Sequence, residues 1–224
     1  MKRDTSVHQV AAPSARLVST FIEGPAGRLE AILRLPPRPR GAAVVAHPHP
    51  LHGGTMHTKV VHRAARLLSD RFSLAALRFN FRGVGSSQGT HDEGRGEVDD
   101  VLAAAGWVRR EAPEGPLVLG GFSFGSVAAL DAAPRLAPDA LLLIGLPLRR
   151  WNAPASAPFA GRVVWIQGSD DEFSDAGSAR VLAERWGWDL HVVPGADHFF
   201  TGRLDAFESE AGGALARVLG EGAA

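Results

Sequence analysis

The sequence predicts an α/β protein built on a mostly parallel sheet of about eight strands, with helices on both faces. From residue 42 onward, short apolar runs alternate with longer segments of helical periodicity. Runs such as AVVA, LVLG, LLLI and VVWI are apolar at successive positions, which is typical of strands covered on both faces. Strand and helix in regular alternation imply crossover connections, and such connections join parallel strands.

Each element follows from these patterns in order. Two apolar runs, Leu17–Ile22 and Leu29–Leu35, flank the turn-forming residues 23–27 and predict a β-hairpin that adds antiparallel strands at one edge. The expected strands that follow are Ala42–Ala46, Leu74–Phe79, Leu117–Gly120, Ala140–Ile144, Arg162–Gln167 and Leu190–Val193. The expected helices are His57–Asp70, Gly96–Arg110, Phe124–Leu136, Ala176–Trp186 and Leu204–Leu219.

Length and composition limit the possible functions. The 224 residues fit a flexible N-terminal tail over 1–15 and a single domain over 16–224. A formal net charge of zero, without long basic runs, argues against nucleic acid or a membrane surface as partner. The sequence has no cysteine, which excludes disulfides and thiolate sites, and no signal-peptide core. We therefore expect a cytoplasmic monomer or homodimer that acts on a small molecule.

The pentapeptide GFSFG (residues 121–125) directly follows the strand LVLG and precedes an expected helix. This G-x-S-x-G pattern is typical of a nucleophilic serine on a sharp strand-to-helix turn, where only glycine leaves room on either side. Ser123 would then lie at a helix N-terminus, whose unpaired N–H groups favour negative charge. We predict that Ser123 is a nucleophile and that the Phe124 N–H is an oxyanion donor. The simpler alternative is a helix-capping serine.

Two later strand ends supply the partners that a nucleophilic serine needs. GSDD (168–171) follows the strand RVVWIQ, and its G-x-x-D spacing favours Asp171 over Asp170 as the acid that orients a histidine. Of the nine histidines, only His198 lies in a loop after the last strand and downstream of that acid. The resulting order of Ser123, Asp171 and His198 is the one expected of α/β-hydrolases.

The segment HPHPLHGG (47–54) follows the first strand of the alternating pattern and is expected to supply the second oxyanion donor. Proline has no N–H, so Pro48 and Pro50 are excluded, and His49 and Leu51 remain as candidates. The H-x-H-x-x-H spacing also suggests a metal site. No further ligand follows at a suitable spacing, so we expect neither a metal nor a cofactor.

Two other patterns are interpreted as structural. GVGSSQG (83–89) matches half of a dinucleotide-binding fingerprint, but it lacks an acid about 20 residues further on and is not on the first strand-to-helix turn. The acidic run from Asp92 to Asp100 is interpreted as the start of a helix, where negative side chains oppose the positive end of the dipole.

Taken together, HPHPLHGGTM (47–56), RFNFRGVGSSQG (78–89), GRGEVDD (94–100), GFSFG (121–125) and GADHFF (195–200) resemble the small bacterial α/β-hydrolases of the dienelactone hydrolase-like group. The resemblance runs from about residue 16 to the C-terminus. It implies an α/β-hydrolase fold and a triad of Ser123, Asp171 and His198. Dienelactone hydrolase itself uses a cysteine nucleophile, so the serine at position 123 favours general serine esterase chemistry.

The segment 145–160, in which this fold usually carries large lids, holds sixteen residues and three prolines. We therefore expect no substantial lid domain and an open site for short-chain esters, lined by Phe122, Phe124, Phe159 and Phe199. A thioesterase or peptidase with the same triad would have the same sequence features. A non-catalytic ligand-binding homologue is a further alternative.

Overall fold

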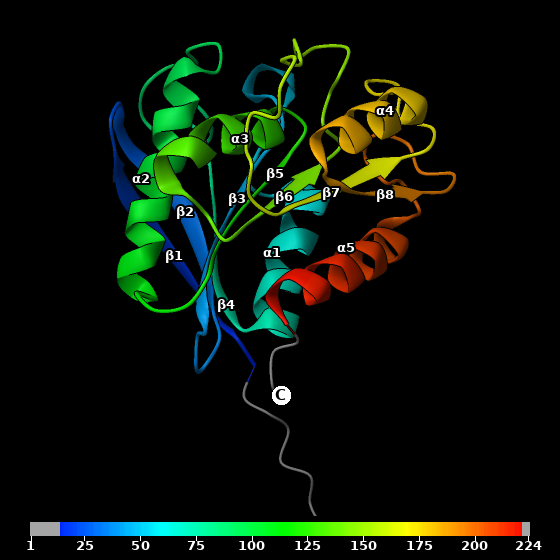
Figure 1. Ribbon diagram of the computed structural model, residues 1–224. Coiled ribbons are helices and arrows are strands. Elements are labelled where there is room, and N and C mark those ends of the chain that lie inside the picture. The colour runs from blue at the N-terminus through cyan, green and yellow to red at the C-terminus, as the bar shows by residue number, and fades with distance from the viewer. Residues whose placement is uncertain (1–13, 221–224) are drawn as a thin grey trace, which may run out of the picture.

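The computed structural model describes residues 14–220, so the tail expected over 1–15 lies almost entirely outside the described residues. The eight strands form one sheet in the order β1-β2-β4-β3-β5-β6-β7-β8, with β1 and β8 at its two edges (Figure 1). Their bounds are β1 Arg16–Gly24, β2 Gly27–Leu35, β3 Gly41–Ala46, β4 Leu74–Phe79, β5 Leu117–Phe122, β6 Ala140–Ile144, β7 Val163–Gly168 and β8 Asp189–Val193.

The antiparallel part of the sheet is confined to one edge. β1 and β2 form the expected hairpin, in which Gly24 pairs with Gly27 across the turn, and β2 then pairs antiparallel with β4. Gly27 has a φ of 115°, a conformation that favours glycine. Every other pairing, from β4–β3 to β7–β8, is parallel. The predicted mostly parallel sheet is therefore confirmed.

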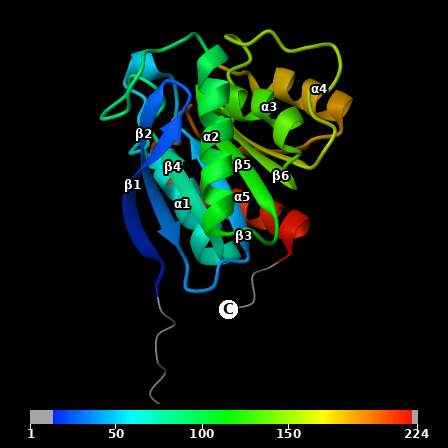
Figure 2. The same cartoon turned by 90° about the vertical axis from the view of Figure 1, so that its left-hand side faces the viewer.

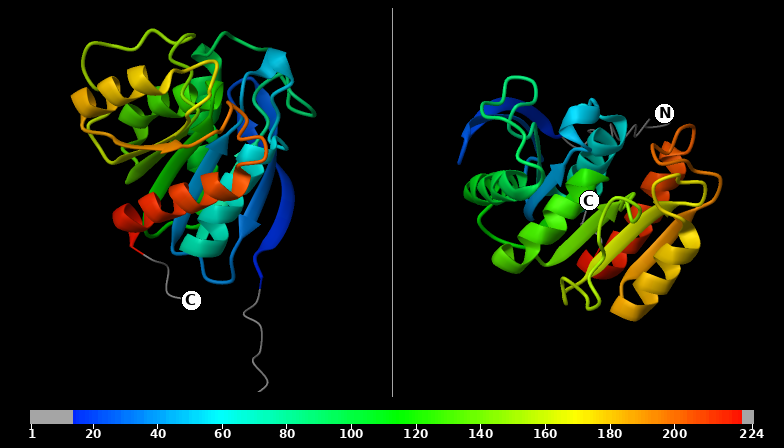
Figure 3. Two further views of the ribbon diagram at one scale, coloured as in Figure 1. Left: turned by 90° about the vertical axis from the view of Figure 1, so that its right-hand side faces the viewer. Right: turned by 90° about the horizontal axis from the view of Figure 1, so that it is seen from above.

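Within residues 14–220, five α-helices cover the two faces of the sheet, and the view from above shows helices on both sides (Figure 3). They are α1 Lys59–Phe72, α2 Arg95–Glu111, α3 Phe124–Leu136, α4 Ala176–Trp186 and α5 Leu204–Leu219. One apolar cluster joins α2, α3 and α4 to one face, and a second joins α1 and α5 to the other. Figure 2 shows α2 in front of the sheet and α1 behind it.

Strand burial follows position in the sheet. Every residue of β3, β4, β5, β6 and β7 is buried, as expected for strands between two helical layers. β8 lies at the edge, and only its last residue, Val193, is buried. No helix among the described residues is long and apolar enough to cross a membrane.

One difference from the expected boundaries lies between β3 and α1. The helix expected from His57 begins at Lys59, after a turn in which the Thr55 N–H lies 3.4 Å from Thr58 Oγ1. Before it, residues Pro50–His52 form a short 3₁₀ helix (η1) that the sequence pattern does not reveal. Its start is capped by the side chain of His49, which accepts from the Leu51 N–H, and this cap shapes the loop beside the nucleophile.

Candidate active site

Ser123 occupies a strained turn between β5 and α3. Its φ of 56° and ψ of −118° are unusual for a residue with a side chain, and such a conformation costs about 1–3 kcal/mol. The turn is held from both sides: the Ser123 N–H donates to the Ile144 carbonyl at 2.8 Å, and the Ser126 side chain donates to the Ser123 carbonyl at 2.6 Å. The surrounding structure therefore fixes the serine in a conformation that the isolated chain would avoid.

The glycines on either side of Ser123 are required by close backbone approach. A Cβ on Gly121 would lie 2.0 Å from the Gly125 carbonyl oxygen. A Cβ on Gly125 would lie 2.5 Å from the carbonyl oxygen of Ala46, at the end of β3. No side chain fits at either position, so the G-x-S-x-G spacing here records the contact between strand, turn and helix.

A continuous hydrogen-bond chain joins the three residues predicted as a triad. His198 Nε2 lies 2.9 Å from Ser123 Oγ, and His198 Nδ1 lies 2.7 Å from Asp171 Oδ2. The His198 and Asp171 side chains are almost fully buried. Because a carboxylate only accepts, the neutral imidazole carries its proton on Nδ1, which leaves Nε2 free to accept the serine proton.

The structure brings Asp171, and not Asp170, to the histidine. Asp170 is exposed and accepts a hydrogen bond from the Ser169 hydroxyl at 2.7 Å. Asp171 Oδ1 instead accepts from the Phe173 N–H at 2.7 Å, and its Oδ2 accepts from Gln167 Nε2 at 2.6 Å. This second bond is made to the same oxygen that accepts the hydrogen bond from His198 Nδ1.

Gln167 is a partner of the acid that the sequence analysis missed. It is fully buried on β7, and its Oε1 accepts from Trp165 Nε1 at 3.0 Å. The side chain therefore cannot rotate freely, and its amide N–H₂ group is held toward Asp171. Its position two residues after Trp165 on the same strand, directly before GSDD, is the only signal in the sequence that could have indicated this role.

Three aromatic rings surround the imidazole of His198. The ring centroids of Phe122, Phe173 and Phe199 lie 5.0, 4.6 and 5.3 Å from it. Phe199 is half exposed and lines the pocket, as expected. Phe122 does not line it, because strand alternation directs this fully buried side chain into the core beneath α1 and α5.

The prediction that Phe159 lines the pocket is also wrong. It packs against the apolar cluster on the α4 side, and its carbonyl accepts from Trp188 Nε1 at 3.3 Å. The loop after β6 contributes Pro147, Arg150 and Trp151 to the pocket instead. No helix forms in residues 145–162, so this loop adds part of a wall and does not form a lid.

His47 has a structural role in the loop after β3. Its Nδ1 lies 2.6 Å from the Pro48 carbonyl, and its Nε2 accepts from the Phe81 N–H at 3.0 Å. Burial lowers the pKa of His47 to about 4, so the ring is neutral at pH 7. Both ring nitrogens are occupied, which removes His47 from the H-x-H-x-x-H metal site that its spacing suggested.

His49 and Leu51, the two candidates for the second oxyanion donor, are placed differently. The Leu51 N–H donates to His49 Nδ1 at 3.2 Å, and the Leu51 side chain is 70% exposed and outside the pocket lining. Its assignment is therefore corrected. His49 lines the pocket, and its ring centroid lies 5.0 Å from that of Phe124. Phe124 is the first residue of α3, so its N–H has no partner within the helix.

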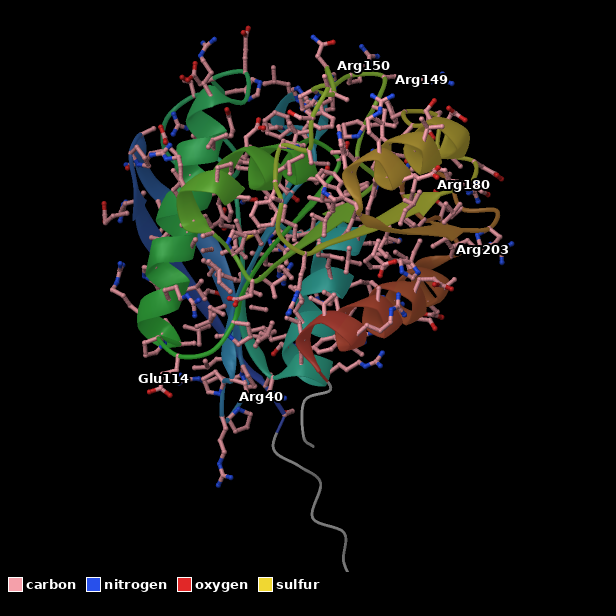
Figure 4. All side chains as sticks on the ribbon, viewed as in Figure 1. Arg40, Glu114, Arg149, Arg150, Arg180 and Arg203 are labelled. Atoms are coloured by element: carbon pink, nitrogen blue, oxygen red, sulfur yellow. The ribbon has the colours of Figure 1, made fainter. Side chains whose placement is uncertain are left out.

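The pocket above Ser123 has a volume of about 870 Å³. It is lined by residues that follow six of the strands, β3 to β8, because the carboxyl ends of parallel strands lie at the same edge. The segments after β3 and β6 rise at this end in the side views (Figures 1 and 2, and Figure 3, left). Labelled Arg150 marks the loop after β6 at the top of the molecule (Figure 4).

The pocket has two chemically different sides. One side, here called the imidazole wall, consists of His49, His52 and His91. The ring centroids of His52 and His91 lie 4.6 and 5.1 Å from that of His49. Burial, together with these two neighbouring imidazoles, lowers the pKa of His49. The larger apolar residues of the pocket are Pro48, Val98, Phe124, Val127, Pro147, Trp151, Phe173 and Phe199.

His91 is a pocket residue that the sequence analysis did not single out. Its Nδ1 lies 2.8 Å from Oε1 of Glu97, a fully buried carboxylate that also accepts from the backbone N–H groups of Asp92 and Gly94. The acidic run is thus only partly a helix start. Glu97 does cap α2, but Asp100 forms a buried ion pair with Arg82 at 2.7 Å, which fixes the loop after β4.

The comparisons with known proteins agree with this architecture. The sequence profile of the α/β hydrolase fold family matches residues 51–146. An uncharacterized protein of Rickettsia prowazekii is 35% identical over 203 residues, which cover 84% of each chain.

Two solved structures are also similar along most of their length. An α/β serine hydrolase without lid from Xanthomonas campestris has a TM-score of 0.84 at 36% identity, covering 92% of this chain and 95% of that chain. An α/β serine hydrolase homologue from Coxiella burnetii has a TM-score of 0.80 at 33% identity, covering 89% of this chain and 97% of that chain. With its sheet order, its strained turn at Ser123 and these relatives, the chain belongs to the α/β-hydrolase fold family, beside members described as serine hydrolases.

Proposed function

We propose that this protein is a serine esterase that cleaves short-chain carboxylic esters through Ser123, His198 and Asp171. The observation that carries the proposal is the unbroken chain of short hydrogen bonds from Ser123 Oγ through His198 to Asp171 Oδ2, at the floor of a pocket. The motif resemblance supports a further proposal, that the protein is a member of the dienelactone hydrolase-like group with serine in place of that enzyme's cysteine.

The proposed reaction is acyl transfer in two steps. His198 Nε2 accepts the Ser123 proton while Oγ bonds to the ester carbonyl carbon, and the carbonyl electrons move onto its oxygen. When the tetrahedral intermediate collapses, the C–O bond to the alcohol breaks and protonated His198 donates its proton to the departing alcohol. Water then repeats the sequence on the acyl-enzyme, with His198 again as base, and releases the carboxylic acid. Asp171 stays ionised throughout and stabilises the imidazolium.

The oxyanion formed in each step would be bound by two backbone N–H groups. Phe124 offers the first, because it opens α3 and its N–H has no helical partner. His49 offers the second, since Leu51 already donates to the His49 ring. Loss of one such donor typically lowers the rate about 10²–10³-fold, so the geometry of the loop after β3 matters nearly as much as the triad.

A preference for short acyl chains follows from the walls of the pocket. The loop after β6 is short and without helices, and Phe173 and Phe199 enclose the space beside His198. Residues 145–162 therefore offer no helix that could cover the pocket and hold a long acyl chain. Activity on p-nitrophenyl esters should therefore fall from butyrate to palmitate, and a steep rise would contradict the proposal.

The decisive experiment is labelling with a fluorophosphonate probe. We expect the wild-type protein to react and Ser123→Ala to show no labelling, with hydrolysis of p-nitrophenyl butyrate reduced about 10⁴-fold or more. Ser169→Ala is a matched control, because Ser169 also follows a strand end but contacts only Asp170 and the Gly195 N–H. A wild-type protein that fails to label, or a Ser123→Ala variant that retains activity, would exclude the proposed mechanism.

A further inference from the structure

A second histidine–carboxylate pair, whose histidine lines the pocket, is not used by the proposed reaction. His91 Nδ1 lies 2.8 Å from Glu97 Oε1, and the Glu97 side chain is fully buried. Because the carboxylate only accepts, Nδ1 carries the proton, and the neutral ring leaves Nε2 as a hydrogen-bond acceptor. The structure thus fixes not only the position of His91 but also which of its nitrogens is free.

His49 has the opposite arrangement. Its Nδ1 accepts from the Leu51 N–H at 3.2 Å, so the neutral ring must carry its proton on Nε2 and offer a donor there. Among residues 14–220, neither Nε2 has a hydrogen-bond partner, and neither is among the fully buried unpaired polar atoms. One free acceptor and one free donor therefore stand on the imidazole wall, on rings whose centroids are 5.1 Å apart.

A hydroxyl group is the chemical group that matches this pair. It can donate to His91 Nε2 and accept from His49 Nε2 at the same time. Two nitrogens bridged by one hydroxyl lie about 4.5 Å apart at normal hydrogen-bond lengths, a span that rings at this separation can provide. A carboxylate would satisfy only the donor, and an ammonium only the acceptor.

The charge of the pocket also favours a neutral group. Its charged lining residues are Arg95 and Arg150 on one hand and Glu93 and Asp131 on the other, so the formal charges cancel. Arg95 is further paired with Asp92 at 2.9 Å. Burial raises the pKa of Asp131, which indicates that even this carboxylate is poorly solvated. A substrate bearing a full charge would find no net counter-charge here.

The imidazole wall is also close to the nucleophile. Phe124 directly follows Ser123, and its ring centroid lies 5.0 Å from that of His49 and 5.8 Å from that of His91. A hydroxyl bound there would belong to the same small molecule as an ester bound at Ser123. We propose that His49 and His91 form a subsite for a hydroxyl group on the ester substrate, so that the protein selects hydroxylated esters. The ester part of this statement depends on the function proposed above.

The test compares three esters of the same size class. Propyl butyrate is the reference without a hydroxyl, glycerol monobutyrate carries hydroxyls on the alcohol side, and propyl 3-hydroxybutyrate carries one on the acyl side. The wild-type protein should show a kcat/KM roughly tenfold higher for at least one hydroxylated ester than for the reference, as expected for two hydrogen bonds of ordinary net strength. The arm that shows the preference identifies the side of the ester that meets the imidazole wall.

Two variants remove the free nitrogens and keep the inner contacts. In His91→Asn the side-chain amide takes the place of Nδ1 and still donates to Glu97, and in His49→Asn the amide oxygen still accepts from Leu51. Each should bring the ratio of hydroxylated to reference kcat/KM close to one. His57→Gln is the matched control, because His57 is exposed and outside the pocket lining, and it should retain the wild-type ratio.

Equilibrium binding separates this inference from the catalytic proposal. Ser123→Ala should bind the preferred hydroxylated ester roughly tenfold more tightly than propyl butyrate by calorimetry, and that preference should be lost when His91→Asn is added. If the wild-type protein does not hydrolyse these esters but the binding preference is found, the proposed esterase activity is refuted and the hydroxyl subsite is not. Three results would overturn the hydroxyl subsite. The first is equal kcat/KM and equal binding for all three esters, and the second is a preference that survives in both asparagine variants. The third is tighter binding of propyl hydrogen succinate, which carries a charge.

Discussion

Two histidine–carboxylate pairs face the same pocket. In both, a fully buried carboxylate lies against the imidazole Nδ1, at 2.7 Å for Asp171 and His198 and at 2.8 Å for Glu97 and His91. In both, the carboxylate also accepts a hydrogen bond from at least one backbone N–H. The pairs are therefore alike in how they fix the tautomer and the orientation of the ring.

The two pairs differ in what the Nε2 of each histidine contacts. His198 Nε2 meets the Ser123 hydroxyl at 2.9 Å, inside a shell of three aromatic rings. His91 Nε2 has no partner among the described residues and faces the space of the pocket, with its side chain 12% exposed. The two proposed roles follow this difference: a general base where the pair meets a strained serine, and a binding group where the histidine lines the pocket.

Neutralising each carboxylate in turn should give the largest difference in kcat between the two pairs. Asp171→Asn leaves His198 without its acceptor and should lower kcat about 10⁴-fold, because the wrong tautomer then faces the serine. Glu97→Gln should lower kcat for propyl butyrate less than tenfold, since its histidine does not transfer the proton. Rates for both variants, with circular dichroism as a check on folding, measure the difference.

The control for that prediction is the neighbouring acid. Asp170→Asn changes an exposed carboxylate that contacts only the Ser169 hydroxyl, and it should keep the wild-type rate. Equal losses in Asp171→Asn and Asp170→Asn would show that the acid has been assigned to the wrong residue. A 10⁴-fold loss in Glu97→Gln with the fold intact would show that His91 takes part in the chemistry.

His47 extends the comparison to a buried histidine that is not paired with a carboxylate among the described residues. Both of its nitrogens are held by backbone groups, and burial lowers its pKa from 6.5 to about 4. In the unfolded chain it gains a proton near pH 6.5, whereas in the folded chain it stays neutral down to about pH 4. Its contribution to stability is therefore present above pH 6.5 and is lost as the pH falls toward 4, by roughly 3 kcal/mol in all.

Urea unfolding between pH 7 and pH 4 measures this loss. His47→Gln is the comparison variant, because its amide oxygen can still accept from the Phe81 N–H but does not titrate in this range. The free energy of unfolding should fall less steeply with decreasing pH in His47→Gln than in the wild-type protein. Parallel pH dependences would mean that the folded protein accommodates a charged His47.

Gln167 should give the smallest of these effects. Gln167→Leu keeps the volume of the side chain but removes the 2.6 Å bond to Asp171 Oδ2, so the carboxylate loses one of its fixed donors. We expect kcat to fall roughly tenfold, in keeping with one charge-assisted hydrogen bond. The acidic limb of the pH–rate profile should also move to higher pH, because the oxygen facing His198 then carries more charge. An unchanged profile with reduced stability would indicate a purely structural role.

The order of strands and helices could be predicted from the sequence because burial produces local patterns of apolar residues. All eight strands and five helices lie where apolar runs and helical periods predicted them. The preference for Asp171 over Asp170 rested on a spacing, and the structure brings that residue to His198. The mistakes concern the direction of single groups: the Phe122 side chain at the end of a strand lies in the core, and the backbone N–H of Leu51 donates to the His49 ring.

Two of the residues that were missed, His91 and Trp151, depend on contacts between distant segments. His91 becomes a pocket residue because a buried ion pair from Arg82 to Asp100 and the cap from Glu97 fix the loop after β4. Trp151 enters the pocket from a loop that carries no periodic pattern. Neither placement is visible in local composition, because each depends on which strands become neighbours in the sheet.

The strained turn at Ser123 has a consequence for when, during folding, the proposed activity would arise. Its geometry requires Gly125 to pass Ala46 at the end of β3 and the Ser123 N–H to reach Ile144 of β6, so three strands far apart in sequence must already be aligned. A partly folded chain, even one with its helices formed, would hold an ordinary unreactive serine. Recovery of fluorophosphonate reactivity during refolding would thus report, in time, when the centre of the sheet closes.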